Sequence, residues 1–385
     1  MRVLVVHTEY RIRGGEDEAV KREVELLQSN GHTVLMLLFE NIGNPAASSV
    51  ALVRSSHNSA SEKRLRASIR EFQPDVVHFH NLWFAGSYSL PAVAKGLRIP
   101  VISSLHNYRH ICVSGDFFRN GKICTDCLSG SLGNAVMHRC YRNSVVASTV
   151  GVVNVKKGRR GAGVADVSER VLVLSATAMA LHLRAGVPRE KLARVNNFVE
   201  APPPRKEAPS KSRSFLFVGR DSPEKGLGLL LEAWAIFRSS YPDFELLLAG
   251  VDSRKPLPSG VRGLGVVSHE IVSQLMNAAR SLVFPSLCFE NQPLVVIEAF
   301  AAALPVITLA GNSAAELMGC PAAGIVVPSA DPLEFSKGLV KLSLDKEVDG
   351  MSRESSRIYA SCHTPEAKIL EMERIYRGAV DGGAA

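Results

Sequence analysis

The sequence lacks long apolar runs and an export signal. The longest uncharged stretches of its 385 residues are interrupted by Gly, Pro, Ser or Asn, so no segment of about 20 apolar residues predicts a transmembrane helix. The N-terminus, MRVLVVHTEY, reads directly as a strand and has neither the charged region nor the cleavage site of a signal peptide. Seven cysteines in a chain of this length do not form a disulfide scaffold. We therefore expect a cytoplasmic protein.

The residues that are present indicate a globular protein of two domains. Hydrophobic residues make up 46% and charged residues 21%, which excludes general disorder, and the length predicts two domains of about 150–200 residues. Residues 1–200 carry 26 Lys and Arg against 16 Asp and Glu, a net charge of +10, whereas residues 201–385 carry 19 against 21, a net charge of −2. The basic half indicates either a solvated surface or an anionic partner, such as nucleic acid, a membrane surface or a phosphate-bearing substrate.

Strand and helix patterns alternate in both halves of the chain. The first half predicts strands at 2–7, 33–39, 74–80 and 100–105, and a helix at 16–29. The second half predicts strands at 215–218, 244–249, 281–284 and 305–309, and helices at 226–239, 294–302 and 365–376. The proline-rich segment 201–211 between them predicts a stiff polar linker. This order predicts the α/β class, with two Rossmann-like doubly wound domains facing a cleft and ligands at the carboxyl ends of the strands.

Two loops that follow predicted strands have the residues of an anion site. Gly14-Gly15 precedes the first helix, where glycine permits close approach of a ligand and helix amides favour an anion. A tight turn without a ligand would use the same glycines. Arg220 follows the strand at 215–218, and Lys225 starts the next helix. Two cations beside helix-terminal amides can neutralise a diphosphate, although pairing of Lys225 with a nearby acid is the alternative.

A third segment places two glutamates eight residues apart. Glu290 lies in the loop before the helix at 294–302, and Pro293 suits the first turn of that helix. The backbone amides after Asn291 can form an anion cradle. Glu298 lies inside the apolar helix, where a carboxylate needs hydrogen-bond donors. A ribose diol supplies two such donors, and an internal ion pair with an arginine is the alternative.

Four cysteines have the spacing of a zinc site: Cys112, Cys124, Cys127 and Cys140. A Cys-x-x-Cys pair with two flanking cysteines matches a tetrahedral site of four thiolates. The surrounding insert is rich in glycine and too small to build its own core, so a structural metal would stabilise it. Reduced thiols, one or two disulfides, or His138 in place of a cysteine remain open. A full thiolate set has no open coordination position, so we expect a structural rather than a catalytic site.

Taken in order, these motifs resemble those of the retaining glycosyltransferases of family 4, the group 1 nucleotide-sugar transferases of GT-B fold. The resemblance covers nearly the whole chain, and the two glutamates at this spacing after Arg220 and Lys225 are its most specific part. Asn291-Gln292 departs from the small residue usual after the first glutamate. The matching segments are Gly14-Gly15-Glu16, Asp75 to Asn81, His106 to Arg109, Asn196 to Val199, Gly219-Arg220, Glu224 to Gly226, Glu290 to Glu298, and Ala301 to Ile307.

The resemblance implies a role for each site residue. Arg220 and Lys225 would bind the donor diphosphate and stabilise the leaving group. Glu298 would bind the ribose and Glu290 the hydroxyls of the donor sugar, while His106 would line the donor-sugar pocket. Gly15 would lend an amide from the opposite lobe. The predicted catalytic residues are His106, Arg220, Lys225 and Glu290; the predicted nucleotide-sugar-binding residues are Gly14, Gly15, Arg220, Lys225, Glu290, Asn291, Gln292, Pro293, Leu294 and Glu298.

The resemblance also implies the reaction. The chain would transfer a hexose, with retention, from a UDP- or GDP-sugar to a glycan or lipid-linked acceptor in cell-envelope polysaccharide synthesis. No Asp-x-Asp sequence is present, so we expect no catalytic metal, and cations and helix amides would stabilise the diphosphate. The basic segment 156–160 follows the apolar segment 145–155 and would contact an anionic membrane surface at its inner face. A flexible solvated loop is the alternative there.

The predicted domains follow from the linker and the resemblance. They are an N-terminal acceptor-binding domain at 1–200 with a Cys-rich insert at 108–142, a linker at 201–212, a nucleotide-sugar-binding domain at 213–362, and a helix and tail at 363–385 that cross back to the first domain. Two other functions fit the sequence less well. One is a nucleotide-sugar isomerase or hydrolase of GT-B fold. The other is a basic zinc-containing nucleic-acid-binding protein, which the 6% of aromatic residues disfavours.

Overall fold

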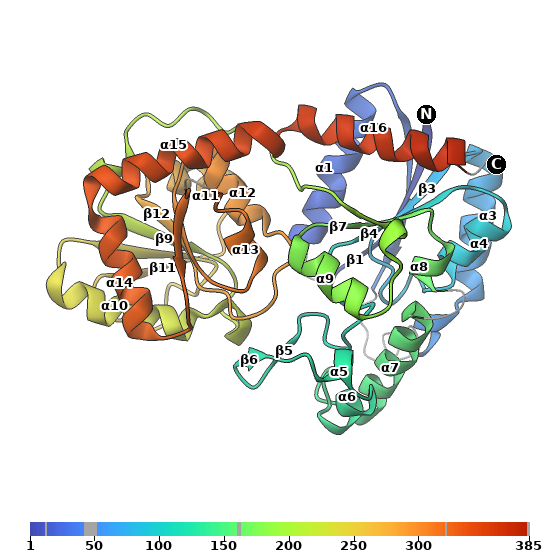
Figure 1. Ribbon diagram of the computed structural model, residues 1–385, viewed down its shortest axis with the longest axis horizontal. Helices are drawn as coiled ribbons and strands as arrows, with labels where there is room; N and C mark the ends of the chain where they lie inside the picture. The colour runs from blue at the N-terminus through green and yellow to red at the C-terminus, as the bar shows by residue number, and fades with distance from the viewer. Residues whose placement is uncertain (12–13, 42–51, 160–162, 320–321, 383–385) are drawn as a thin grey trace. The chain divides into compact units, whose positions relative to one another are not determined.

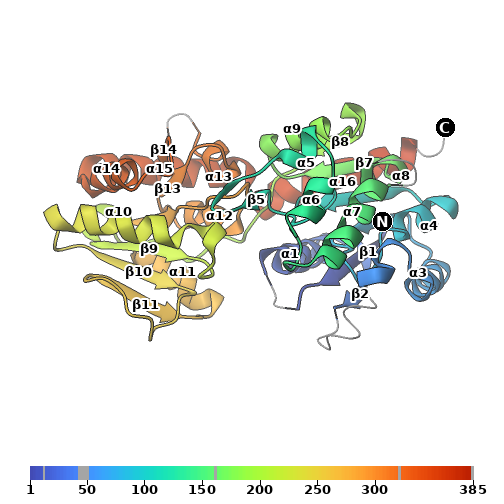
Figure 2. The ribbon, with the colours of Figure 1, turned by 90° about the horizontal axis from the view of Figure 1, so that it is seen from below.

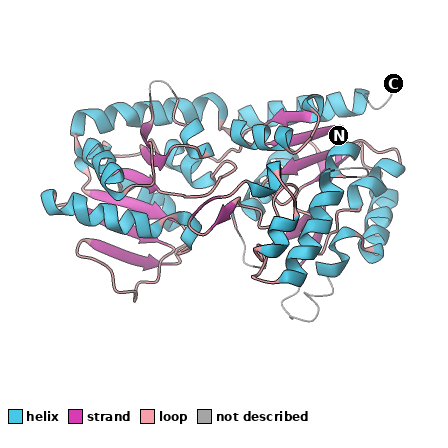
Figure 3. Ribbon diagram, turned by 60° about the horizontal axis from the view of Figure 1, so that its bottom comes forward, coloured by secondary structure: helices cyan, strands magenta, loops and turns pink. Residues whose placement is uncertain are grey.

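The structure is a computed structural model that describes residues 1–11, 14–41, 52–159, 163–319 and 322–382. The chain divides into two compact units. The first unit contains Met1–Phe117, Cys124–Asn196 and Lys368–Ala385, and the second contains Phe118–Ile123 and Asn197–Ala367. Each unit is an α/β layer structure in which helices flank a central sheet (Figure 3).

The sheet of the first unit has six parallel strands in the order β2-β1-β3-β4-β7-β8. Its strands form where short β-branched and apolar runs can be buried on both faces; Val3 to Val6 at the centre are at most 1% exposed. The strands are β1 (Arg2–Glu9), β2 (Thr33–Glu40), β3 (Val76–Phe79), β4 (Val101–Leu105), β7 (Arg170–Val173) and β8 (Leu192–Arg194).

Helices cover this sheet and an insert extends from it (Figure 1). The helices are α1 (Gly15–Ser29), α3 (Ser59–Phe72), α4 (Leu90–Gly96), α5 (Asp126–Ser129), α6 (Gly133–Met137), α7 (Val145–Arg159), α8 (Val164–Val167), α9 (Ala176–Arg184) and, from Lys368 on, α16 (Pro365–Gly382), with short 3-10 turns at Arg54–Ser56 and Arg189–Lys191. Between Phe117 and Cys124 the chain forms the hairpin of β5 (Phe118–Arg119) and β6 (Lys122–Ile123), which belongs to the second unit. None of the helices among the described residues is both long enough and apolar enough to cross a bilayer.

The second unit repeats the architecture. Its six parallel strands follow the order β11-β10-β9-β12-β13-β14. They are β9 (Ser214–Val218), β10 (Glu245–Ala249), β11 (Val261–Gly265), β12 (Ser281–Phe284), β13 (Val306–Leu309) and β14 (Gly324–Val327). The helices are α10 (Leu227–Ser240), α11 (His269–Ala278), α12 (Leu294–Ala301), α13 (Ser313–Glu316), α14 (Pro332–Ser343) and α15 (Asp345–Cys362), with 3-10 turns at Pro209–Lys211 and Pro223–Lys225.

Alternation along the strands of the second unit builds a core on each face of its sheet. Phe215 and Phe217 of β9 share a core with residues of α10 and α14, and Leu216 between them shares a core with residues of α11, α12 and α15. Figure 2 shows α10 alongside β9. Because both faces are covered, the sheet is doubly wound. The predicted fold class, two doubly wound α/β domains, is therefore confirmed, and each predicted strand is present with its bounds shifted by at most a few residues.

The strand order fixes where a ligand site belongs. In the second sheet the chain runs outward from β9 to β11 and then returns to β12 and runs the other way to β14, so the order reverses between β9 and β12. In the first sheet it reverses between β1 and β3. Ligands of such sheets bind beyond the carboxyl ends of the strands at the point of reversal.

Candidate active site

The loops after β9 and β12 come close together at the point of reversal in the second unit. Gly226 has a φ of +73°, and a Cβ on it would lie 2.0 Å from the carbonyl oxygen of Pro285. Gly250 has a φ of +94°, and its Cβ would lie 2.3 Å from the carbonyl oxygen of Gly219. Only glycine fits at these two positions, because any side chain would collide with backbone. The two glycines therefore let the ends of β9, β10 and β12 approach.

Lys225 and Glu290 form an ion pair in this region. The Lys225 Nζ lies 2.7 Å from the Glu290 Oε1, and the Ser286 hydroxyl donates to the same oxygen at 2.7 Å. The side chains of Lys225 and Glu290 are 23% and 15% exposed. Burial alone would raise the pKa of Glu290, but the Lys225 ammonium holds it below its usual value. Burial alone would lower the pKa of Lys225, but the Glu290 carboxylate raises it.

Arg220 remains accessible beside this pair. Its side chain is 75% exposed, and its Nη2 lies 3.6 Å from the Glu224 Oε1. Its charge is near enough to Lys225 to oppose the protonation of that lysine. Such an exposed pair contributes little to stability, so the Arg220 guanidinium can exchange Glu224 for an anionic ligand. The structure thus brings Arg220, Lys225 and Glu290 together, as predicted from the sequence order.

Glu298 has a different partner from the one expected. It lies on α12, its side chain is 16% exposed, and its Oε1 is 3.0 Å from the Nε2 of His269, in the first turn of α11. The carboxylate is therefore half-buried and paired with a histidine, whereas the sequence predicted either a ligand or an arginine. His269 is 63% exposed, so it can move aside for a ligand hydroxyl. A surface pocket of about 920 Å³ also borders His269, but it lies along 200–212 and α11 and contains none of the predicted site residues.

The residues before α12 have structural partners. Pro293 is the N-cap of this helix and Leu294 its first residue. The Gln292 Oε1 accepts the backbone N–H of Asn197 at 2.5 Å, and the Gln292 carbonyl accepts from the Asn197 side chain at 2.9 Å. Asn291 is buried, at 7% exposure. The Gln292 side chain therefore anchors the segment that enters the second unit, a contact that the sequence did not predict.

In the first unit, Gly14 and Gly15 begin α1 as expected. Gly14 is the N-cap, and its backbone N–H donates to the Asp17 Oδ2 at 3.0 Å. Asp17 is also bound by the His7 Nε2 at 2.8 Å. His106 follows β4, where the carboxyl ends of β1, β3 and β4 meet. Its Nε2 lies 2.9 Å from the Nδ1 of His80.

The structure adds a buried charged cluster that the sequence did not predict. Among the described residues, one group of three side chains has potential metal-ligand atoms all within 4.8 Å of one another: Glu23, His78 and His80. Lys368 of α16 lies 3.2 Å from the Glu23 Oε2, and the Tyr376 hydroxyl lies 2.9 Å from the His78 Nδ1. A signal existed, because Glu23 lies between Val20 and Val24 on the apolar side of α1, and His78 and His80 lie on the same side of an extended segment.

The four cysteines of the insert are not in disulfides and are half-buried. Cys127 and Cys140 pack against a small core of Val113, Leu132, Ala135, Val152 and Val155. Burial, followed by the charges of the other three cysteines, raises the pKa of Cys127 to about 11. Among the described residues, no three of their sulfur atoms lie within 4.8 Å of one another. The structure therefore places the four cysteines in one region of the first unit.

Comparisons with known proteins agree with this architecture. Residues 14–201 match the family model "Glycosyltransferase Family 4", and residues 212–345 match "Glycosyl transferases group 1". The chain is 24% identical over 337 residues to the alpha-monoglucosyldiacylglycerol synthase of Acholeplasma laidlawii, with 83% of this chain and 79% of that protein covered. It is 26% identical over 182 residues to a phosphatidyl-myo-inositol mannosyltransferase of Mycolicibacterium smegmatis, with 44% of this chain and 47% of that protein covered.

Solved structures show the same fold. The sucrose-phosphate synthase of Thermosynechococcus elongatus superposes with a TM-score of 0.69 at 17% identity, with 99% of both chains covered. HepE of Anabaena, solved in complex with UDP-glucose, superposes with a TM-score of 0.66 at 15% identity, with 98% of this chain and 100% of that chain covered. These neighbours are GT-B glycosyltransferases. With its two units matched in order by the two family models, the chain is a glycosyltransferase of family 4 with a group 1 second domain.

Proposed function

We propose that the second unit binds a nucleoside-diphosphate sugar and that the enzyme transfers its hexose to a glycan or lipid-linked acceptor with retention. The observation that carries the proposal is the Lys225–Glu290 pair beside the exposed Arg220 at the point of strand reversal. A diphosphate leaving group gains negative charge as its bond to the sugar breaks. Fixed cations in a partly buried site stabilise that charge more than water does, because they need not reorganise.

Each acidic residue has a part in this proposal. Glu290 is ionised and already held by Lys225 and Ser286, so its remaining acceptor positions can bind donor-sugar hydroxyls. The Glu298 carboxylate would exchange its contact with His269 for the two ribose hydroxyls, which can donate hydrogen bonds to its oxygens. In the absence of an assigned nucleophile, the acceptor hydroxyl would attack from the face that the diphosphate leaves, and the diphosphate would accept its proton.

A donor screen tests the proposal. Thermal shifts with UDP-, GDP- and ADP-sugars should show stabilisation by a UDP- or GDP-sugar, since HepE is a UDP-glucose complex. Glu298→Gln should remove the shift, whereas Glu232→Gln on α10 is a matched control outside the site. No shift with any nucleotide sugar would contradict the proposal. Nucleotide release that does not require an acceptor would instead indicate a hydrolase.

We also propose that the reaction needs no divalent metal. Lys225 and Arg220 supply the two positive charges that a metal ion would otherwise bring to a diphosphate. Transfer activity should persist in EDTA after dialysis against it. A loss that Mg²⁺ or Mn²⁺ restores would contradict this part of the proposal without affecting donor binding by Glu298.

The acceptor side of the proposal concerns the first unit. Two relatives are named for lipid substrates, a diacylglycerol glycolipid and phosphatidyl-myo-inositol, and the first 200 residues have a net charge of +10. Large apolar side chains are exposed on α6 and α7, where Met137 is 68% and Val146 71% exposed. Lys156 lies on the same helix, whereas Arg160 of the predicted basic segment is outside the described residues. We propose that this surface contacts an anionic membrane.

Vesicle sedimentation tests the membrane contact. The protein should sediment with phosphatidylglycerol vesicles and not with phosphatidylcholine vesicles. Val146→Glu should reduce binding, because it places a negative charge at the membrane surface. Val266→Glu is the matched control, since Val266 is 95% exposed in the second unit. Equal binding of both variants would contradict the assignment of α7.

A structural zinc ion in the insert completes the proposal. The support is the cysteine spacing and the gathering of the thiols around a core too small to be stable alone. The expected content is about one zinc per chain in reduced protein. Cys127→Ser should lose the metal, and Cys362→Ser on α15 should retain it. Elemental analysis that finds no zinc would contradict this proposal and leave the enzyme assignment intact.

A further inference from the structure

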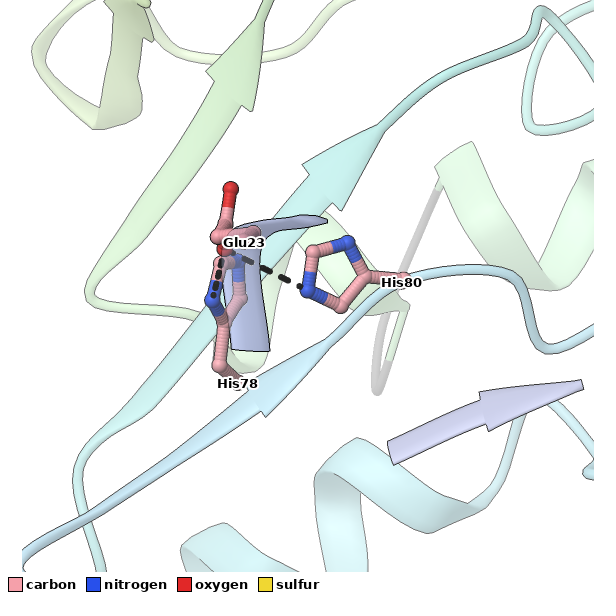
Figure 4. A group of neighbouring side chains, drawn as sticks. All are labelled: Glu23, His78 and His80. Atoms are coloured by element: carbon pink, nitrogen blue, oxygen red, sulfur yellow. Dashed lines mark ion pairs between the residues drawn. The ribbon is translucent and has the colours of Figure 1, made fainter. Parts of the chain in front are cut away.

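The buried cluster of the first unit leads directly to His106. Figure 4 shows Glu23 beside both rings, with dashed lines marking its ion pairs to His78 on β3 and to His80 just beyond that strand. The Glu23 Oε1 lies 3.2 Å from the His78 Nδ1 and 3.6 Å from the His80 Nε2. On its other side, the His80 Nδ1 lies 2.9 Å from the His106 Nε2. Glu23, His80 and His106 therefore form a continuous chain of polar atoms.

Glu23 is ionised in this chain. Burial would raise its pKa, but the Lys368 ammonium, 3.2 Å from the Oε2, and His78 hold the pKa well below its usual range. His80 is neutral, because burial, followed by the charge of His78, lowers its pKa well below the usual range. Burial also lowers the pKa of His106. A negative charge thus faces one nitrogen of a neutral imidazole.

This arrangement selects one tautomer for each histidine. The His80 Nε2 is buried and has no hydrogen-bond partner among the described residues, and the Glu23 carboxylate is the charge beside it. A proton on this nitrogen is attracted to the carboxylate, whereas a lone pair there would be repelled. With its proton on Nε2, His80 has an acceptor at Nδ1. His106 must then donate its Nε2–H to His80, which leaves a lone pair on the His106 Nδ1.

We propose that Glu23 and His80 are positioning residues that fix His106 as a hydrogen-bond acceptor, through Nδ1, for a hydroxyl of the donor sugar. His106 is half-buried and follows β4, and its Nδ1 has no hydrogen bond among the described residues. The inference rests on the proposed function for the role of the sugar. The tautomer itself follows from the contacts and charges within the first unit, so it can be tested without any substrate.

Long-range proton–nitrogen NMR of protein labelled with ¹⁵N-histidine reads the tautomers directly. The signals of His80 and His106 are assigned by their loss in His80→Gln and His106→Gln. We expect both rings to carry the Nε2–H tautomer at neutral pH. In Glu23→Gln, the amide would donate to the His80 Nε2, so the proton of His80 should move to Nδ1 and that of His106 should move to Nδ1. Tyr376→Phe is the matched control, because it removes a hydrogen bond to His78 only and should leave both tautomers unchanged.

A binding measurement connects the tautomer to the sugar. Glu23→Gln should weaken binding of the preferred nucleotide sugar about tenfold, the effect of one lost hydrogen bond, and should leave binding of the nucleotide alone unchanged. An Nδ1–H tautomer or a charged ring of His106 in the wild type would overturn the inference, even if Glu23→Gln fails to fold. Unchanged tautomers in folded Glu23→Gln would overturn it as well. If the wild type binds no nucleotide sugar but shows the expected tautomers, the proposed function fails and the arrangement of the histidines stands.

Discussion

Removal of Lys225 should affect stability and catalysis separately. Its Nζ lies 2.7 Å from the Glu290 Oε1, and both side chains are mostly buried. Removing one member of a buried ion pair lowers the unfolding free energy by about 3–5 kcal/mol, because the other charge remains buried without a partner. The exposed fractions of 23% and 15% and the retained Ser286 hydrogen bond place Lys225→Met near the lower end, at about 3 kcal/mol.

A double-mutant cycle separates this charge effect from packing. In Lys225→Met the Glu290 carboxylate is buried without its cation, and Glu290→Gln removes that charge. The double variant Lys225→Met/Glu290→Gln should therefore be about 2 kcal/mol more stable than the sum of the two single effects predicts. The chain has two tryptophans, Trp83 in the first unit and Trp234 in the second. In a Trp83→Phe background, the fully buried Trp234 reports urea unfolding of the second unit alone.

Activity should not follow stability in this cycle. Each single substitution should reduce kcat/KM by about 10²–10³-fold, corresponding to about 2–4 kcal/mol in the barrier, and the double variant should not recover. If the effects of the two single substitutions on the unfolding free energy simply add in the double variant, Lys225 and Glu290 do not interact in the way proposed. Recovery of activity together with stability would show that Lys225 acts only through folding.

Three further outcomes are expected from other sites. Arg220→Ala should leave the unfolding free energy within about 0.5 kcal/mol of the wild type, because its pair is exposed, while steady-state kinetics show a loss of about 100-fold. Lys368→Met should destabilise the first unit by about 3 kcal/mol in urea titrations, because it leaves Glu23 charged and buried. Glu23 has a lowered pKa in the folded state, so its contribution to stability is present above pH about 4.5 and should be lost as acid titration passes through the folded pKa.

The sequence predicted the fold well where patterns were local. Apolar runs such as 2–7 and 215–218 became central strands, because both faces of a doubly wound sheet bury such runs. Short or polar edge strands such as Leu192–Arg194 and Val261–Gly265 have no comparable run, and their pairing with a neighbour defines them. The predicted helix at 365–376 continues to Gly382, because Tyr376 and Ala379 are buried within the first unit.

The sequence predicted the site residues whose strands are neighbours in the sheet, and it missed the contacts between residues that only the tertiary packing brings together. Arg220, Lys225 and Glu290 follow two neighbouring strands, so the topology brings them together. The partner of Glu298 could not be predicted, because His269 comes from a helix whose packing depends on the whole unit. Lys368 lies more than 300 residues from Glu23 in the chain, and no local pattern connects them.

The proposed reaction requires that the second unit bind the pyrophosphate of a nucleotide. Calorimetric titration of the preferred nucleoside diphosphate into wild-type protein, Arg220→Ala and Arg357→Ala tests it most directly, because Arg357 is an exposed arginine of the same unit that pairs locally on α15. We expect wild-type affinity for Arg357→Ala and a loss of about tenfold or more for Arg220→Ala, because a charge-assisted hydrogen bond to the diphosphate is removed. Equal affinity of all three proteins would contradict it.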